Sequence, residues 1–194
     1  MQTQTERGFP VHTIESSPEP SRTHLADARR EFGMLANMHA VMSESPALLE
    51  AYATLWRLVG QTSLSAAERH VVFLTASVAN GCDYCVPAHT ALAARDGLDT
   101  ESIEALRAGR PLADSRLDAL RRFTLRMIES RGQIEAADLD ALLAEGFTRA
   151  AALDVLVGLA TKLLSNYTNG VANVPLDEPF GAFAWSGAPA LQDA

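Results

Sequence analysis

Apolar residues recur every three to four positions along most of this chain, which is the spacing of one face of an α-helix. No segment sustains the alternation of apolar and polar residues that marks a strand. The turn dipeptides Asn80-Gly81 and Asp96-Gly97 are flanked by helical patterns. The fold class is therefore predicted to be all-α. The expected helices cover residues 25–42, 46–59, 65–79, 82–95, 100–108, 115–131, 134–144 and 148–169.

Helix-start signals support two of these segments. Ser45 precedes Pro46, which gives an N-cap followed by proline at the first helical position. Ser65 and Glu68 have the spacing of a capping box. The helix that this box opens is apolar nearly all round over residues 71–79, so we expect it at the centre of the fold.

The length of 194 residues suits one domain with a terminal arm. Residues 1–21 are polar and contain prolines, so we expect an arm there, either flexible or packed on a neighbouring subunit. Residues 22–194 are expected to form a single all-helical domain. Its last part is an irregular tail whose Phe180, Phe183 and Trp185 need to be covered by packing of the tail or by a subunit contact.

The net charge of −8, without a long basic block, argues against nucleic acid or an anionic membrane as a partner. The first 22 residues lack the apolar stretch of a secretory signal, and no run approaches the roughly 20 apolar residues of a membrane span. We therefore expect a cytoplasmic protein. In a reducing compartment, two cysteines at CxxC spacing indicate catalysis or metal binding more than a structural disulfide.

Both cysteines of the chain lie in one short segment with a histidine. Cys82, Cys85 and His89 are spaced so that one face of a helix carries all three side chains. Asn80-Gly81 interrupts the preceding helix and Pro87 suits an early helical position, so we expect both cysteines in the first turns of a new helix. The positive end of the helix dipole lowers a thiol pKa there, and this argument alone favours Cys82 as the nucleophile.

Other readings of these three residues are weaker. The cysteines could be small buried packing residues, but their redox spacing and the nearby histidine argue against that. Zinc would use Cys82, Cys85 and His89 with a water, yet three ligands on two turns of one helix rarely surround a tetrahedral ion. Covalent haem requires a histidine directly after the second cysteine, where this chain has Val86. We expect no metal and no cofactor.

Three further side chains are candidates for proton transfer. His89 can accept a thiol proton or stabilise the thiolate. If the helices before and after Asn80-Gly81 fold back on each other, His70 faces His89 better than Glu68 does. Glu68 stays a candidate although the capping box already accounts for it. The catalytic set predicted from the sequence is therefore Cys82, Cys85, His89, His70 and Glu68.

The segment over residues 64–93 resembles the motif region of the alkylhydroperoxidase D-like branch of the carboxymuconolactone decarboxylase superfamily. The matching elements are Leu64-Ser65, Glu68-Arg69, Ser77, Asn80-Gly81 and the run from Cys82 through Cys85 to His89. The resemblance is strongest over residues 45–109. Residues 166–180 are similar, more weakly, to the closing segment of the longer, peroxidase-related members.

This resemblance implies an all-helical bundle assembled into trimers or hexamers, with the CxxC pair at the start of a core helix. It also implies a thiol peroxidase in which a hydroperoxide oxidises Cys85 to a sulfenic acid. Cys82 then donates a proton and condenses with Cys85 to a disulfide, which a lipoyl-type or thioredoxin-type dithiol reduces.

The chain departs from the family pattern at two positions. The family carries a glutamate of its proton relay twelve residues before the first cysteine, where this chain has His70. Some members carry a histidine directly before the second cysteine, where this chain has Tyr84. A neutral histidine lacks the fixed charge of a glutamate, so we expect a different pH profile, a modest peroxidase activity or another substrate.

Two other functions compete with the peroxidase. A lactone decarboxylase like the superfamily's namesake is one, although such members generally lack the CxxC pair. A non-catalytic oligomeric redox sensor, in which the disulfide switches the shape of the protein, is the other.

Overall fold

The computed structural model describes residues 3–187 and confirms the all-α prediction, since these residues form helices and no strand beyond an isolated bridge between Gln4 and Pro10. The α-helices are α1 (Arg22–Phe32), α2 (Asn37–Met42), α3 (Pro46–Val59), α4 (Ala66–Ala79), α5 (Cys85–Arg95), α6 (Thr100–Arg107), α7 (Ser115–Glu129), α8 (Ala136–Ala144) and α9 (Arg149–Ala172). Two short 3-10 helices, η1 (Glu19–Ser21) and η2 (Glu178–Phe183), lie near the two ends.

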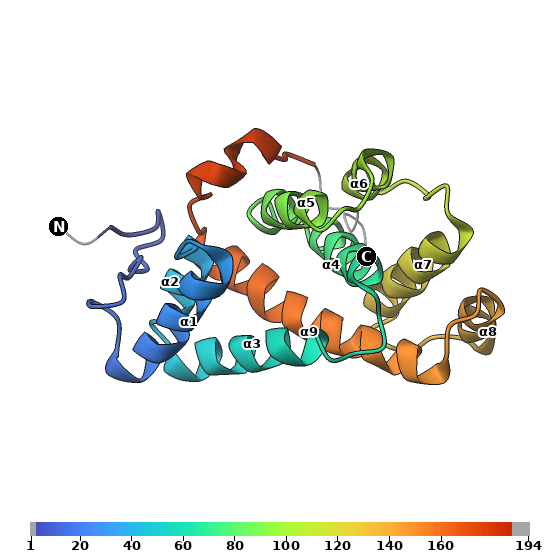
Figure 1. Ribbon diagram of the computed structural model, residues 1–194, viewed down its shortest axis with the longest axis horizontal. Coiled ribbons are helices and arrows are strands. Elements are labelled where there is room, and N and C mark those ends of the chain that lie inside the picture. Colours follow the sequence, from blue (N-terminus) through green and yellow to red (C-terminus); the bar gives the residue numbers. More distant parts are fainter. Residues whose placement is uncertain (1–2, 188–194) are drawn as a thin grey trace.

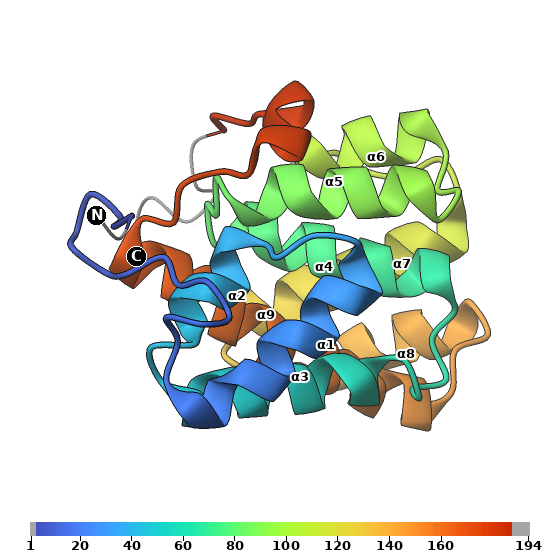
Figure 2. The same cartoon turned by 60° about the vertical axis from the view of Figure 1, so that its left-hand side comes forward.

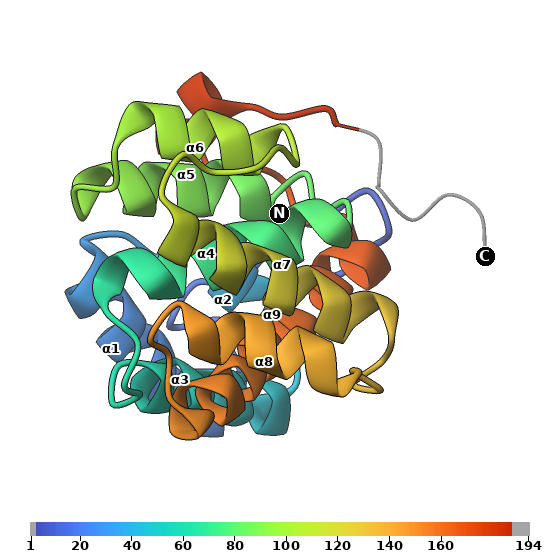
Figure 3. The same cartoon turned by 90° about the vertical axis from the view of Figure 1, so that its right-hand side faces the viewer.

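The predicted central helix is central in the structure. α4 is buried along almost its whole length and packs against α5, α6, α7 and α9 (Figure 3). Its capping box is present, because Ser65 N–H donates to Glu68 Oε2 at 2.7 Å and Glu68 N–H donates to Ser65 Oγ at 3.2 Å. The long helix α9 crosses beneath α4 and also packs against α3 (Figure 1). α4 and α9 therefore frame the region in which the cysteines lie.

The sequence prediction of one helix over residues 25–42 is wrong. Gly33 adopts a left-handed φ of 74° and ends α1, and Ala36 is extended before α2 begins. Glycine reaches this conformation without steric cost, so the apolar spacing continues across a real break. The break places His39 of α2 beside Phe32 of α1, with ring centroids 5.5 Å apart.

Both ends of the described chain pack on its own core. Phe9 and Val11 of the arm lie against the cluster that contains both cysteines, and Arg7 donates to the carbonyls of Gly170 and Val171 at the end of α9. A contact of this arm with another subunit stays a prediction. Residues 1–2 of the predicted arm and 188–194 of the predicted tail lie outside the described residues.

The aromatic tail packs on the chain itself, which leaves Phe180, Phe183 and Trp185 half-buried. η2 lies along α5 (Figure 2), where the Phe180 ring meets the Tyr84 ring edge to face. Trp185 donates from Nε1 to the carbonyl of Arg107 at 3.0 Å. Of the two covers expected for these aromatic residues, the structure shows packing of the tail.

The contact between α4 and α9 depends on a glycine, which gives a stability prediction. A Cβ at Gly158 would lie 2.8 Å from Val72 Cγ1, whereas a Cβ at Gly170 of the same helix meets no atom within 4 Å. Alanine at Gly170 should raise the free energy of unfolding by up to about 1 kcal/mol. Alanine at Gly158 should leave the protein about 1–3 kcal/mol less stable than that control. Urea unfolding of both variants measures the difference, and equal stabilities would contradict the packing described here.

Candidate functional site

The CxxC segment is a turn that leads into α5. Cys82 N–H donates to the carbonyl of Ser77 at 2.9 Å, and Val86 N–H donates to the carbonyl of Cys82 at 3.0 Å. Pro87 has no N–H to donate to the carbonyl of Asp83, so the regular helix begins at Cys85. The prediction that both cysteines sit within the helix is therefore correct for Cys85, whereas Cys82 lies just before it.

A cavity of about 200 Å³ opens beside α5, and Cys85 lines it while Cys82 does not. Its wall is mainly apolar and aromatic, and it also contains the basic side chains of Arg95 and Lys162. The apolar and aromatic lining comes from Phe32, Met34, Ala36, Met38, Tyr52, Trp56, Tyr84, Ala88, Ala91, Leu92 and Phe180. A substrate that enters this cavity meets the sulfur of the second cysteine.

The polar face of α9 completes the site, and its residues were not among those predicted from the sequence. Lys162 is 1% exposed, and its Nζ lies 2.7 Å from His89 Nε2. Asn166 Oδ1 accepts a hydrogen bond from Asn80 Nδ2 at 2.9 Å. The buried polar residues Lys162, Ser165, Asn166 and Asn169 recur at helical spacing in a mainly apolar helix, which is the signal that could have identified them.

The surroundings of Cys85 favour its thiolate. Burial alone raises the pKa of this thiol. The interaction with the Cys82 thiol, the positive charge of Lys162 and the polar side chains of Asn166 and Ser165 outweigh burial and lower the pKa of Cys85 to about 6. At neutral pH, Cys85 is therefore ionised.

Cys82 has the opposite tendency. Burial raises the pKa of the Cys82 thiol, and its hydrogen bond to the Cys85 sulfur and the charge of that thiolate raise it further. The helix dipole alone had favoured Cys82 as the nucleophile, but the cavity and the lysine both belong to Cys85. The arrangement suits a Cys85 nucleophile with a protonated Cys82 beside it.

His89 is a neutral partner of the lysine. Burial and the nearby charge of Lys162 hold the pKa of His89 well below its usual range. Since Lys162 donates to Nε2, the proton of the neutral ring sits on Nδ1, which is buried and has no hydrogen-bond partner among the described residues. His89 therefore fixes the position of the Lys162 ammonium and holds a donor on its opposite side.

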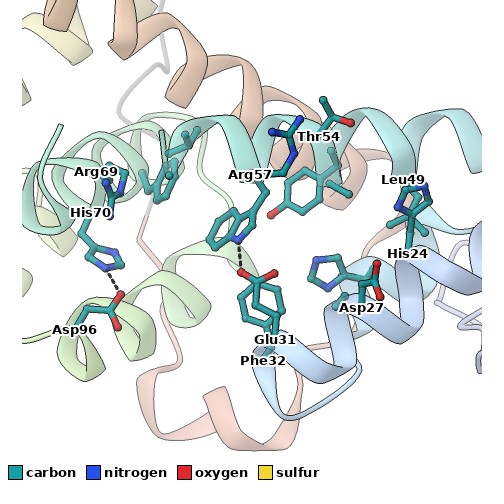
Figure 4. A pocket seen from close by; sticks show the side chains of 18 of the residues that line it. His24, Asp27, Glu31, Phe32, Leu49, Thr54, Arg57, Arg69, His70 and Asp96 are labelled. Atoms are coloured by element: carbon teal, nitrogen blue, oxygen red, sulfur yellow. Dashed lines mark hydrogen bonds and ion pairs between the residues drawn. The ribbon is translucent and has the colours of Figure 1, made fainter. Parts of the chain in front are cut away.

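His70 lines a second, larger cavity of about 630 Å³ (Figure 4). The residues that line both cavities are Phe32, His39, Tyr52, Trp56 and Arg95. His70 Nε2 lies 2.9 Å from Asp96 Oδ2 at one end of it. The His70 ring contacts Phe73, whose ring also contacts His89, with centroids 6.5 and 5.0 Å apart. The phenylalanine thus touches both histidines.

Glu68 is engaged elsewhere. Its Oε2 completes the capping box, and its Oε1 accepts from Arg116 Nη2 at 3.0 Å. The hydrogen bonds of both carboxylate oxygens therefore stabilise the start of α4 and its contact with α7, and a catalytic role for Glu68 stays a prediction. Among residues 3–187, no group of three or more His, Cys, Asp or Glu side chains is arranged to hold a metal ion, and no helix there is long and apolar enough to cross a membrane.

Tyr84 and Asp83 connect the CxxC turn to its surroundings. The Tyr84 hydroxyl donates to Asp177 Oδ2 at 2.5 Å and accepts from Met38 N–H at 3.3 Å. Asp83 Oδ1 accepts from Asn169 Nδ2 at 2.7 Å. The turn is therefore held between the end of α9, the start of α2 and the C-terminal segment.

Comparison with known proteins identifies related folds. Residues 46–125 match the model of the carboxymuconolactone decarboxylase family. A peroxidase-related protein from Ralstonia eutropha JMP134, described as an alkylhydroperoxidase AhpD core, is 22% identical with a TM-score of 0.79 over 89% of this chain and 93% of its own. A peroxidase-related protein from Silicibacter sp. TM1040 is 21% identical with a TM-score of 0.76 over 93% of this chain and 97% of its own.

A third structure carries a different activity in its name. The debrominase Bmp8, in complex with 2,3,4-tribromopyrrole, is 16% identical with a TM-score of 0.75 over 94% of this chain and 97% of its own. No curated protein sequence matches the chain. At these identities the structural similarities establish the fold and leave the reaction open. Residues 46–125 thus match the carboxymuconolactone decarboxylase family, and the structural similarities show that the chain has the helical fold of alkylhydroperoxidase D-like proteins.

Proposed function

We propose that the protein is a thiol-dependent peroxidase that reduces organic hydroperoxides at Cys85. The observation that carries the proposal is that Cys85, the cysteine with the lowered pKa, is the one that lines the apolar cavity. Cys82 is three residues away, with its sulfur 3.2 Å from the Cys85 nitrogen, and its pKa is raised. One thiolate is thus presented to substrate with a protonated thiol behind it.

The proposed reaction has three steps. The Cys85 thiolate attacks the terminal oxygen of the hydroperoxide, the O–O bond breaks, and Cys85 becomes a sulfenic acid while the leaving alkoxide takes the Cys82 proton. The Cys82 sulfur then attacks the Cys85 sulfur, the S–S bond forms, and hydroxide leaves and is protonated by solvent. A dithiol donor, of lipoyl or thioredoxin type, reduces the disulfide and is itself oxidised.

The aromatic lining of the cavity favours an organic hydroperoxide over hydrogen peroxide as the substrate. Its aromatic wall offers apolar contact to a substituent on the peroxide, and burial of that substituent contributes about 25 cal/mol per Å² of apolar surface. Hydrogen peroxide has no such group. We therefore expect a higher kcat/KM for a bulky organic hydroperoxide.

The lowered pKa of Cys85 predicts the pH dependence of the first step. Its thiolate is present above a pKa of about 6 and is lost as the pH falls through that value. The rate constant for reaction with hydroperoxide should be level near neutral pH and fall about tenfold per unit below the pKa. Stopped-flow measurement under single-turnover conditions isolates this step. A rate that keeps rising up to pH 9 would contradict a pre-formed Cys85 thiolate.

The test of the proposed function is hydroperoxide consumption by the purified protein with a reduced dithiol such as dihydrolipoamide. Sustained turnover beyond one equivalent supports the peroxidase. If a disulfide forms with one equivalent and no dithiol restores the thiols, the redox-sensor alternative replaces it. Consumption that persists after alkylation of both thiols would exclude the thiol mechanism. Assembly into trimers or hexamers remains part of this proposal.

The same thiol pair suits a second candidate, reductive removal of halogen from an aromatic compound. The observation in its favour is the aromatic character of the Cys85 cavity, and a structural neighbour is named a debrominase. In that reaction the halogen leaves as halide, hydrogen takes its place on the ring, and the Cys82–Cys85 dithiol is oxidised to the disulfide. Halide release from 2,3,4-tribromopyrrole, compared with hydroperoxide reduction under the same donor, distinguishes the two.

A further inference from the structure

Lys162 is a lysine whose side chain lies fully buried in the described part of the chain. It is 1% exposed, yet it appears in none of the ion pairs with carboxylates among the described residues. Among residues 3–187, the two buried acidic side chains, Glu68 and Asp177, bond to Arg116 and Tyr84 instead. A buried charge without a counter-charge is costly, so the lysine needs an anion from elsewhere.

The helices α3, α4 and α5 each place an aromatic or titratable side chain around Lys162. From α4 the Phe73 ring lies 5.9 Å from Nζ with His70 behind it, and from α5 the neutral His89 accepts its hydrogen bond. From α3, burial raises the pKa of Tyr52, so this phenol stays protonated.

The other titratable groups that share its cavity are His39, Tyr84, Arg95 and Cys85. Burial lowers the pKa of His39 to about 4, which leaves it neutral, and burial raises the pKa of Tyr84. Arg95 is exposed and pairs with Asp96. Among the described residues that line this cavity, the one anion near neutral pH is the Cys85 thiolate.

We propose that Lys162 sets the reduction potential of the Cys82–Cys85 pair, because the charge it faces exists only in the reduced protein. In the dithiol state the Cys85 thiolate balances Lys162 inside the core. In the disulfide state the thiolate charge is gone, and the ammonium keeps only the hydrogen bond to neutral His89. Lys162 therefore stabilises the reduced state relative to the disulfide and makes the disulfide strongly oxidising.

The proton balance of disulfide reduction by a dithiol donor shows the effect of Lys162. The donor loses two electrons and two protons, its disulfide forms, and the protein S–S bond breaks. One proton goes to the Cys82 thiol and the other is released, since Cys85 stays a thiolate in the cavity that it shares with Lys162. Lys162 is thus a positioning residue that favours recharging of the enzyme by weakly reducing donors. This role rests on the dithiol chemistry of the proposed function.

The test is the equilibrium constant of the pair against a dithiol of known potential, measured for the wild type and Lys162→Met by mass spectrometry of trapped thiols. Methionine keeps the length of the side chain and removes the charge. The equilibrium should move toward the oxidised protein by about tenfold or more, which for a two-electron couple is a potential lower by about 30 mV. The thiolate absorbance of Cys85 should also titrate at a higher pH in the variant.

Thr161→Val is the matched control, because Thr161 is fully buried on the same helix and its side chain bonds to the carbonyl of Val157. Its potential should equal that of the wild type. A Lys162→Met variant with an unchanged potential, in a folded protein with a normal circular dichroism spectrum, would overturn the inference. The measurement needs no peroxide, so it fails or succeeds independently of peroxidase turnover.

Discussion

Replacing Cys85 with serine should reduce hydroperoxide turnover by at least about a thousandfold, since removal of a nucleophile costs this much or more in enzymes. Serine has nearly the same size as cysteine, and the Cys85 side chain packs in a buried site, so the fold should persist. Steady-state consumption of an organic hydroperoxide with a reduced dithiol measures the effect. Residual activity within tenfold of the wild type would show that another group attacks the peroxide.

Cys82→Ser is the matched control for that experiment. The variant keeps the Cys85 thiolate and its cavity but has no second thiol to form the disulfide. It should consume one equivalent of hydroperoxide rapidly and then slow down, because the sulfenic acid has no partner within the chain. A variant that turns over as fast as the wild type would remove the disulfide from the cycle.

Filling the cavity should have the second largest effect. Ala88 lines the cavity next to Cys85, and phenylalanine there would occupy much of its roughly 200 Å³. We expect kcat/KM for a bulky aralkyl hydroperoxide to fall by about tenfold or more, and kcat/KM for hydrogen peroxide to fall less. The ratio of the two constants is the measurement.

Ala94→Phe serves as its control, since Ala94 lies exposed on the same helix and lines neither cavity. Its selectivity should match that of the wild type. If Ala88→Phe lowers both constants equally, while thermal unfolding shows an intact protein, the substrate does not use this cavity.

Local signals in the sequence predicted most of the fold. Ser45 and Ser65 cap α3 and α4 as expected, because N-cap chemistry involves only neighbouring residues. Helix ends were less certain where a single residue decides them. Pro87 removes one hydrogen bond and moves the start of α5 to Cys85, and Gly33 divides a continuous apolar pattern into two helices.

The site was predicted only in part, for a similar reason. Cys82, Cys85 and His89 are close in sequence, so their spacing was enough to make them candidates. Lys162 lies 73 positions beyond His89, and only packing of α9 against α3 and α4 brings its ammonium to the imidazole. Glu68 shows the opposite case, because a motif position alone could not reveal that Arg116 already binds its carboxylate.

The position of His70 relative to His89 could be predicted from the sequence, but its hydrogen-bond partner could not. Its place on α4 was expected to face His89, and the Phe73 ring contacts both histidines. Its hydrogen bond to Asp96 depends on the C-terminal end of α5 returning to α4, which periodicity does not specify. A proton path through His70 stays a prediction, and its partner in that path would be Asp96.

The most direct test of the proposed mechanism is to identify which of the two sulfurs is oxidised first. Cys82→Ser and Cys85→Ser are each treated at neutral pH with one equivalent of an organic hydroperoxide in the presence of dimedone, which traps sulfenic acids. Peptide mass spectrometry then locates the adduct. We expect a rapid adduct on Cys85 in the Cys82→Ser protein and almost none on Cys82 in the Cys85→Ser protein. Equal or faster trapping on Cys82 would contradict the assignment of Cys85 as the nucleophile.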